Sequence, residues 1–102
     1  MIVEMRIYKL AVGRLEDYLE AYRTAGFALQ RRHLGDPIGW YVADGGPLSQ
    51  VVSLWQYRDH EDRAARRAKL LGDRDWRAFL ERVSPLFDAM ENRFLVPVAL
   101  TD

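Results

Sequence analysis

The stretch SQVVSLWQYRDHEDRAARR, residues 49–67, joins a predicted strand to a basic helix and decides how the rest of the chain is arranged. Side chains alternate between the two faces of a strand, so Val52 and Leu54 share one face, and Ser53, Trp55 and Tyr57 share the other. Both faces carry large side chains that favour burial. Because one face is aliphatic and the other is aromatic and polar, the two faces must be covered by different surroundings.

The second half of this stretch predicts a helix that begins at Asp59. Asp59 can cap the helix, and acidic residues follow in the first turn, where the helix dipole favours negative charge. Asp62 and Arg66 stand four residues apart in the favourable order for an ion pair. The basic residues of this helix are offset by acidic neighbours, so we expect a solvated helix face rather than a binding patch, formed by Arg63, Arg66, Arg67 and Lys69.

The flanking sequence supplies the remaining elements. Residues 2–8 alternate as a strand, with Val3, Met5 and Ile7 on one face and Glu4, Arg6 and Tyr8 on the other. Apolar residues at helical spacing follow from Arg14 until Gly35. Further segments are predicted in chain order: a strand at 38–43, a turn at 44–47, a strand at 50–57, a helix broken near Gly72, and a last strand at 94–100. Pro97 predicts that this last strand either lies at an edge or ends irregularly.

The order β-α-β-β-α-β predicts a ferredoxin-like α+β fold, with residues 1–102 forming a single domain. In this fold the helices cover one face of the sheet. We expect the aliphatic face to pack on the helices: Val3, Met5, Ile7, Val52 and Leu54. The opposite face would then be bare, and it is too aromatic to remain in water. We therefore expect a homodimer through that sheet face, a dimeric α+β barrel, with these residues at the interface: Glu4, Arg6, Tyr8, Ser53, Trp55 and Tyr57.

Composition excludes several classes of protein. Fifteen basic and fifteen acidic residues cancel, which argues against a nucleic-acid partner. The chain has no cysteine, so disulfides and thiolate metal sites are excluded. No apolar run has the length of a membrane span, and the first residues lack the layout of a signal peptide. We expect a cytoplasmic protein with no membrane association.

The segments now identified resemble the NIPSNAP family. The similarity covers nearly the whole chain, and the matching segments follow one another in order: VEMRIY at 3–8, LQRRHLG at 29–35, GPLSQVVSLWQY at 46–57, DR at 62–63, RR at 66–67, DWRAF at 75–79 and MENRFLVP at 90–97. The resemblance implies a dimeric α+β barrel of ferredoxin-like subunits, which agrees with the fold derived from the residues. Eukaryotic members are associated with mitochondria and vesicle traffic, whereas bacterial single-domain members are mostly uncharacterised.

The wider superfamily implied by this resemblance includes cofactor-independent monooxygenases of aromatic polyketides, haem-degrading enzymes, isomerases and dehydratases. One position departs from the family pattern. The place of Ser53 often carries a histidine in the family, so the serine weakens any proposal that this position supplies an imidazole base.

Candidate catalytic residues are Glu4, Arg6, Tyr8 and His33. Glu4 and Arg6 share a strand face and form either a structural ion pair or a site in which Arg6 binds an oxyanion and Glu4 acts as acid or base. His33 is either stabilised by a helix C-terminus or functional. The expected ligand-binding residues are Arg6, Ser53, Trp55 and Tyr57. The two histidines lack ligand spacing, and no motif for a cofactor is present, so we expect neither a metal nor a cofactor.

Three functions remain open from the sequence. The first is an enzyme that binds and transforms a small aromatic or polyketide-like molecule by metal-independent acid–base chemistry, as a monooxygenase, isomerase or cyclase would. The second is a non-catalytic binding or interaction module that uses the same cavity. The third is a structural dimer in which the polar residues fix only the register of the interface.

Overall fold

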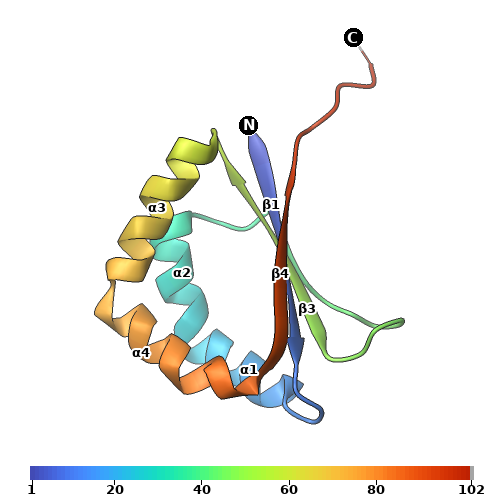
Figure 1. The fold of residues 1–102 in the computed structure, drawn as a ribbon, viewed down its shortest axis with the longest axis vertical. Helices are drawn as coiled ribbons and strands as arrows, with labels where there is room; N and C mark the ends of the chain where they lie inside the picture. Colours follow the sequence, from blue (N-terminus) through green and yellow to red (C-terminus); the bar gives the residue numbers. More distant parts are fainter. Residues whose placement is uncertain (102) are drawn as a thin grey trace.

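The computed structural model describes residues 1–101 as a four-stranded antiparallel sheet whose helices all lie on one face (Figure 1). The elements in chain order are β1 (Ile2–Leu10), α1 (Leu15–Ala21), the π-helical turn η1 (Tyr22–Gly26), α2 (Phe27–Leu34), β2 (Gly39–Val42), β3 (Gln50–Tyr57), α3 (His60–Gly72), α4 (Arg74–Val83), the 3-10 turn η2 (Ser84–Leu86) and β4 (Phe87–Leu95). None of these helices is long and apolar enough to cross a membrane.

The strand order is β2-β3-β1-β4, which confirms the predicted ferredoxin-like arrangement with β1 and β3 adjacent and central. The register pairs Glu4 with Trp55 and Arg6 with Ser53 across β1 and β3. Paired residues lie on the same face of a sheet. The side chains of Glu4 and Arg6 therefore lie beside those of Trp55 and Ser53, on one face.

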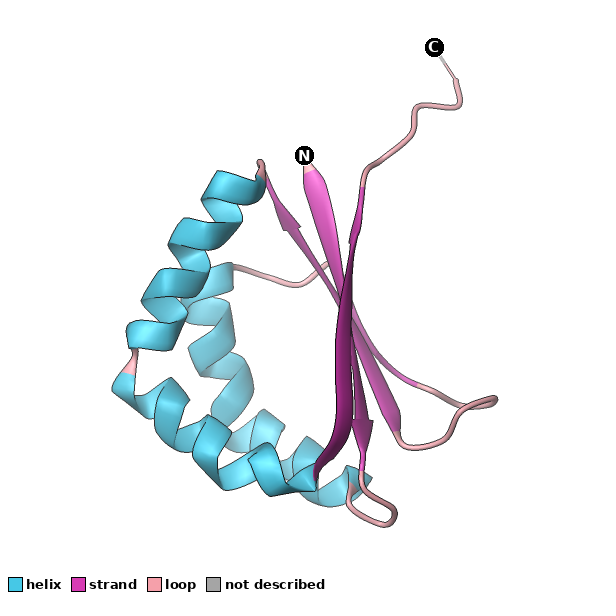
Figure 2. Cartoon of the chain, in the orientation of Figure 1, coloured by secondary structure: helices cyan, strands magenta, loops and turns pink. Residues whose placement is uncertain are grey.

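The face that contacts the helices is the opposite of the predicted one. Glu4, Trp55 and Tyr57 are buried between sheet and helices, whereas Ile7 and Leu54 lie on the face that no helix covers (Figure 2). The prediction that Val3, Met5, Ile7, Val52 and Leu54 pack on the helices is therefore wrong. The physical reason is that α3 brings arginine side chains to the buried Glu4, so a charged strand face can be buried without an unpaired charge.

The last strand also differs from its prediction. The apolar run at 94–100 predicted a strand there, but β4 spans Phe87–Leu95, and Pro97 lies beyond its end. Backbone pairing with β1 determines this strand, because all its side chains except that of Phe87 are exposed and contribute little to the core. β4 is an edge strand, as Pro97 indicated. The apolar residues after it extend away from the rest of the chain (Figure 1).

The helix boundaries follow the capping residues that the sequence indicates. The Asp59 carboxylate accepts a hydrogen bond from the Asp62 N–H at 2.7 Å, and Asp73 caps α4 by accepting from Asp75 and Trp76. Gly35 ends α2 with a φ of 82°, a conformation that favours glycine. These contacts confirm the predicted start of α3, and Asp73 begins the second part of the helix that was predicted to break near Gly72.

The π-helical turn between α1 and α2 was not predicted. It ends at Gly26, where the helix approaches Phe79 of α4 so closely that a Cβ atom at this position would overlap the Phe79 ring and lie 2.8 Å from Tyr22. Tyr22 stacks on Trp40 with ring centroids 4.9 Å apart. Gly26 thus lets α4 pack directly against the turn that positions this aromatic cluster.

The substitution Gly26→Ala should destabilise the fold by about 1–3 kcal/mol, because the added methyl group overpacks the contact with Phe79. Gly72→Ala is the matched control, since nothing lies within 4 Å of a Cβ built at this position. Its stability should be unchanged or slightly raised. Urea denaturation of both variants tests this, and equal midpoints would show that the contact with Phe79 can relax.

Candidate functional site

The centre of the candidate site is the Glu4 carboxylate, which is fully buried between sheet and helices. Arg63 binds it with two hydrogen bonds, from Nε to Oε1 at 3.1 Å and from Nη2 to Oε2 at 2.9 Å. Arg6 Nη1 donates to Oε2 at 2.8 Å, and Asn92 Nδ2 donates to the same oxygen at 2.9 Å. Four donors from three residues therefore bind the carboxylate, three at Oε2 and one at Oε1.

Three elements far apart in the sequence bring these side chains together. Alternation along β1 places Glu4 and Arg6 on the helix side, and the register pairs Arg6 with Asn92 of β4. In α3, Arg63 and Arg67 stand one turn apart, on the same side of the helix. The network thus joins β1 to its neighbouring edge strand and to the helix above them.

This environment fixes the ionisation state of Glu4. Burial opposes its charged form, but the hydrogen bonds from Arg63 and Asn92 and the charges of Arg6 and Arg63 outweigh burial and lower the pKa of Glu4 to about 2. A carboxylate that holds no proton near neutral pH and is fully buried cannot act as a general acid toward a ligand. It acts instead as the anchor of the arginines.

Arg6 is held from two sides. Its Nε donates to the Tyr8 hydroxyl oxygen at 2.7 Å while its Nη1 binds Glu4. Burial disfavours the charged guanidinium, but Tyr8 and Glu4 outweigh this effect and hold the pKa of Arg6 above its usual value. Because Tyr8 accepts this bond, its own O–H remains able to donate to another group.

A cavity of about 290 Å³ opens beside this network, between β1, β4 and α3. The residues that line it are Arg6, Tyr8, Arg63, Arg67, Met90, Glu91 and Asn92. The Glu91 carboxylate lies 3.5 Å from the Arg93 guanidinium, so a cation already faces it. The lining is therefore rich in cations and hydrogen-bond donors and poor in free acceptors.

Arg67 differs from the other arginines of this cavity. Arg67 is partly buried, and its side chain forms no ion pair or hydrogen bond within residues 1–101. Burial lowers the pKa of Arg67, and repulsion from Arg6 lowers it further. The fold thus places a cation in the cavity wall without a partner of opposite charge.

Tyr57 supplies a second unsatisfied group. Its side chain is 2% exposed, and its hydroxyl has no hydrogen-bond partner among the described residues. Burial raises the pKa of Tyr57 to about 12, the charge of Glu4 adds to this effect, and Arg67, Arg63 and Arg6 oppose it. The hydroxyl therefore stays protonated, lies within the field of the arginine network, and is available as a donor.

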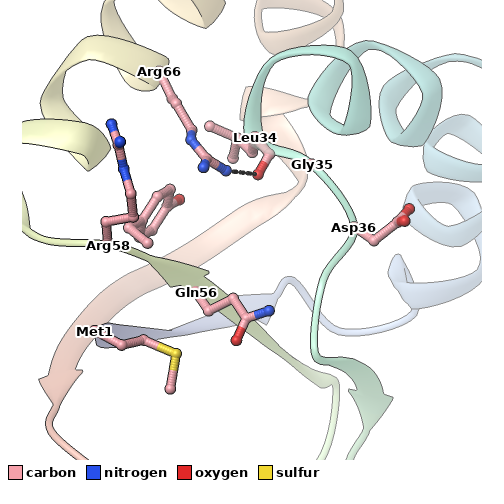
Figure 3. A pocket seen from close by; sticks show the side chains of 8 residues that line it. Met1, Leu34, Gly35, Asp36, Gln56, Arg58 and Arg66 are labelled. Carbon is pink, nitrogen blue, oxygen red and sulfur yellow. Dashed lines mark hydrogen bonds between the residues drawn. The ribbon is translucent and has the colours of Figure 1, made fainter.

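A larger cavity, of about 470 Å³, lies at the end of α2 (Figure 3). Its prominent cation is already satisfied, because Arg66 donates to the Leu34 carbonyl oxygen at 3.0 Å and to Asp62 at 3.0 Å. Arg58 also lines this cavity but extends into solvent, with its side chain 83% exposed. Tyr57 also lines this larger cavity. We place the candidate site in the smaller cavity because Arg67, a cation without a partner among residues 1–101, lines it beside two further arginines, and volume alone does not define a site.

The remaining predicted site residues lie apart from this cavity. His33 Nε2 is 2.8 Å from an oxygen of Asp73, so it links α2 to the residue that caps α4. The hydrogen bond with His33 lowers the pKa of Asp73. The Trp55 Nε1–H donates to Ser53 Oγ at 2.9 Å in the buried interior, and neither residue lines the two cavities. These contacts give all three residues a structural role.

Sequence analysis missed Arg63, Arg67 and Asn92. The expectation of a solvated basic face on α3 is wrong for Arg63 and Arg67, which turn toward the sheet. The available signal was the spacing of Arg63 and Arg67, one helical turn apart, opposite a strand with an acidic residue that needs a partner. Among residues 1–101, no three His, Cys, Asp or Glu side chains are grouped to hold a metal ion.

Comparison with known proteins places this geometry in a family. The NIPSNAP family model matches residues 3–101. A NipSnap homologue from Dictyostelium discoideum is 32% identical over 97 residues, which cover 95% of this chain and 43% of that protein. The chain thus spans less than half the length of this curated relative.

Solved structures agree with this match. A NIPSNAP family protein from Agrobacterium tumefaciens superimposes with a TM-score of 0.94 at 46% identity, covering 98% of this chain and 95% of that one. An antibiotic biosynthesis monooxygenase superimposes with a TM-score of 0.69 at 11% identity, covering 97% of this chain and 100% of that one. At this identity the second similarity shows the fold alone.

Replacing the anchor, in Glu4→Gln, should destabilise the protein by about 3 kcal/mol or more at pH 7, because buried arginines then lack their counterion. The ionised carboxylate stabilises the folded state above the pKa of the unfolded chain, near 4.5, and this contribution is lost as pH falls toward 2. The stability difference between wild type and Glu4→Gln should therefore shrink between pH 5 and pH 2.

Urea denaturation at several pH values measures this difference. Glu81→Gln, at an exposed position on α4, is the matched control and should follow the wild type throughout. A difference between wild type and Glu4→Gln that stays constant down to pH 2 would show that the charge of Glu4 does not stabilise the fold.

Proposed function

The chain belongs to the NIPSNAP family, and we propose that it binds a small anionic molecule in the cavity between β1, β4 and α3. The observation that carries this proposal is Arg67, a partly buried cation without a counterion beside two further arginines. A charge that is partly buried without a partner is less stable than one in water, and repulsion from neighbouring arginines adds to this cost. A bound anion removes this cost. Anion binding therefore explains the position of Arg67, which the packing of the chain alone does not explain.

The state of Glu4 favours binding over acid–base catalysis. A general base needs access to the substrate and a pKa near the working pH, and the fully buried Glu4 has neither. The second candidate function is the transformation of a small aromatic or polyketide-like molecule without a metal. The Tyr57 hydroxyl favours this candidate, because a buried donor without a partner can stabilise an enolate or carbonyl oxygen.

We also propose that a second copy of the chain covers the open face of the sheet. Val3, Met5, Ile7, Val52 and Leu54 form a continuous aliphatic surface there, across the two central strands. Tyr41 extends this surface onto β2 and is 53% exposed. A patch of this kind is characteristic of an interface.

The segment after β4 supports this assembly. Val96, Val98 and Leu100 are 72%, 75% and 89% exposed and extend beyond the sheet (Figure 1). These apolar side chains find no cover within their own chain, so we place them against the second copy. The proposed homodimer thus uses the sheet face opposite to the one expected from the sequence.

Arg67→Met should weaken the binding of benzoate, a small aromatic carboxylate, by about tenfold or more, because it removes a charge-assisted hydrogen bond. Amide chemical shifts of the residues that line the cavity would report the binding. Arg74→Met changes the net charge equally at an exposed position on α4 and should bind like the wild type.

The same variant should fold at least as stably as the wild type, by about 0–1 kcal/mol, since it removes an unpaired charge. Urea denaturation measures this. Loss of stability together with loss of binding would show that Arg67 maintains the fold. If benzoate causes equal changes of amide chemical shift in Arg67→Met and wild type, the cavity is excluded as the binding site.

Ile7→Lys should convert a homodimer to a monomer at micromolar concentration, because it buries a charge in the middle of the proposed interface. Leu71→Lys is the matched control, since Leu71 is 48% exposed on α3 and lies away from the open sheet face. Sedimentation velocity distinguishes the two states. A wild-type chain that sediments as a monomer at these concentrations would contradict the proposal.

A further inference from the structure

We propose that the group recognised by this cavity carries two negative charges, as a phosphate monoester or a vicinal dicarboxylate does. This inference rests on the proposed function, which locates an anion in the cavity, and it adds the charge and the chemical class of that anion. It follows from the balance of charges and hydrogen-bonding groups around the cavity.

The charges are not balanced within the described chain. Three guanidinium groups line the cavity, those of Arg6, Arg63 and Arg67. Glu4 is the carboxylate that binds two of them, and the carboxylate of Glu91 faces Arg93 instead. Two positive charges are therefore left over, and a ligand with one negative charge would leave one of them uncompensated.

The hydrogen-bonding groups are unbalanced in the same direction. Tyr8 accepts from Arg6 and keeps its own O–H to donate. Arg63 uses two of its five N–H groups on Glu4, and Arg67 uses none within residues 1–101. Glu4 already accepts four hydrogen bonds, so it offers nothing to a donor on the ligand. The ligand group must consist mainly of acceptor oxygens.

The shape of the cavity limits the rest of the ligand. The planar fork of a guanidinium group matches the paired oxygens of a phosphate or carboxylate, and two such forks stand one turn apart on α3, at Arg63 and Arg67. Met90 supplies an apolar part of the lining, and the volume of about 290 Å³ is at the small end for ligand sites. A compact molecule with a small organic group fits these limits.

The test compares ligands that differ in charge but little in shape. Phenyl phosphate is mostly dianionic at pH 7.5 because its second pKa is near 6, whereas phenyl sulfate carries one charge. Phthalate and benzoate form the corresponding carboxylate pair. Binding to the full chain is measured by titration calorimetry at constant ionic strength, with Arg67→Met and the control Arg74→Met alongside.

We expect one or both dianions to bind about tenfold tighter or more than their monoanionic counterparts, and Arg67→Met to abolish most of that preference. Preference for phenyl phosphate over phthalate identifies a phosphate monoester, and the reverse preference identifies a dicarboxylate. Arg74→Met should retain the preference in either case.

Two outcomes would overturn the inference in different ways. If monoanions bind as tightly as dianions and still require Arg67, the doubly charged ligand is wrong and the anion site stands. If none of the four compounds binds, or if binding ignores Arg67, the proposed function fails as well.

Discussion

The buried carboxylate of Glu4 is the constraint on which the rest of the structure depends. A charged group with no exposure is tolerated only if its lone pairs are satisfied, and four donors from Arg6, Arg63 and Asn92 satisfy them. These donors fix α3 above β1 and fix β4 beside it. The same contacts prevent Glu4 from exchanging a proton near neutral pH, so one interaction sets both the layer geometry and the chemical character of the cavity.

Much of the fold could be predicted from local signals, because caps and periodicity are local. Asp59 and Asp73 mark their helix starts, and alternation identifies β1 and β3 together with the residues that share each face. Which face meets the helices is a tertiary property. Both faces of β3 favour burial, and the deciding contact joins residues 59 positions apart, Glu4 and Arg63, which no window of local sequence contains. The bounds of β4 could not be predicted for the same reason, since pairing with β1 rather than the hydrophobic pattern determines them.

The candidate site was predictable in part. Arg6 and Tyr8 do meet beside a cavity, because period-two spacing on a central strand requires it. Three other predicted site residues form hydrogen bonds within the packed structure instead: His33, Ser53 and Trp55. These hydrogen bonds account for their polar groups without a ligand. Ser53 accepts the Trp55 N–H, so its hydroxyl has a structural partner in the interior. Arg67 could not be assigned from sequence, because its distinguishing property is the absence of a partner.

The two faces of the sheet have different proposed roles. Residues 4, 6 and 8 of β1 point toward α3, where Arg6 and Tyr8 line the proposed anion cavity, and residues 3, 5 and 7 point away and form the aliphatic surface. A shift of one residue in strand register would exchange these faces, burying Lys9 and exposing Glu4, so the Glu4 network also specifies the register. The second copy proposed for the open face would lie on the side of the sheet opposite the cavity that Arg6 and Tyr8 line. Dimer formation and anion binding are therefore separate proposals, and substitutions on the two faces of β1 test them independently.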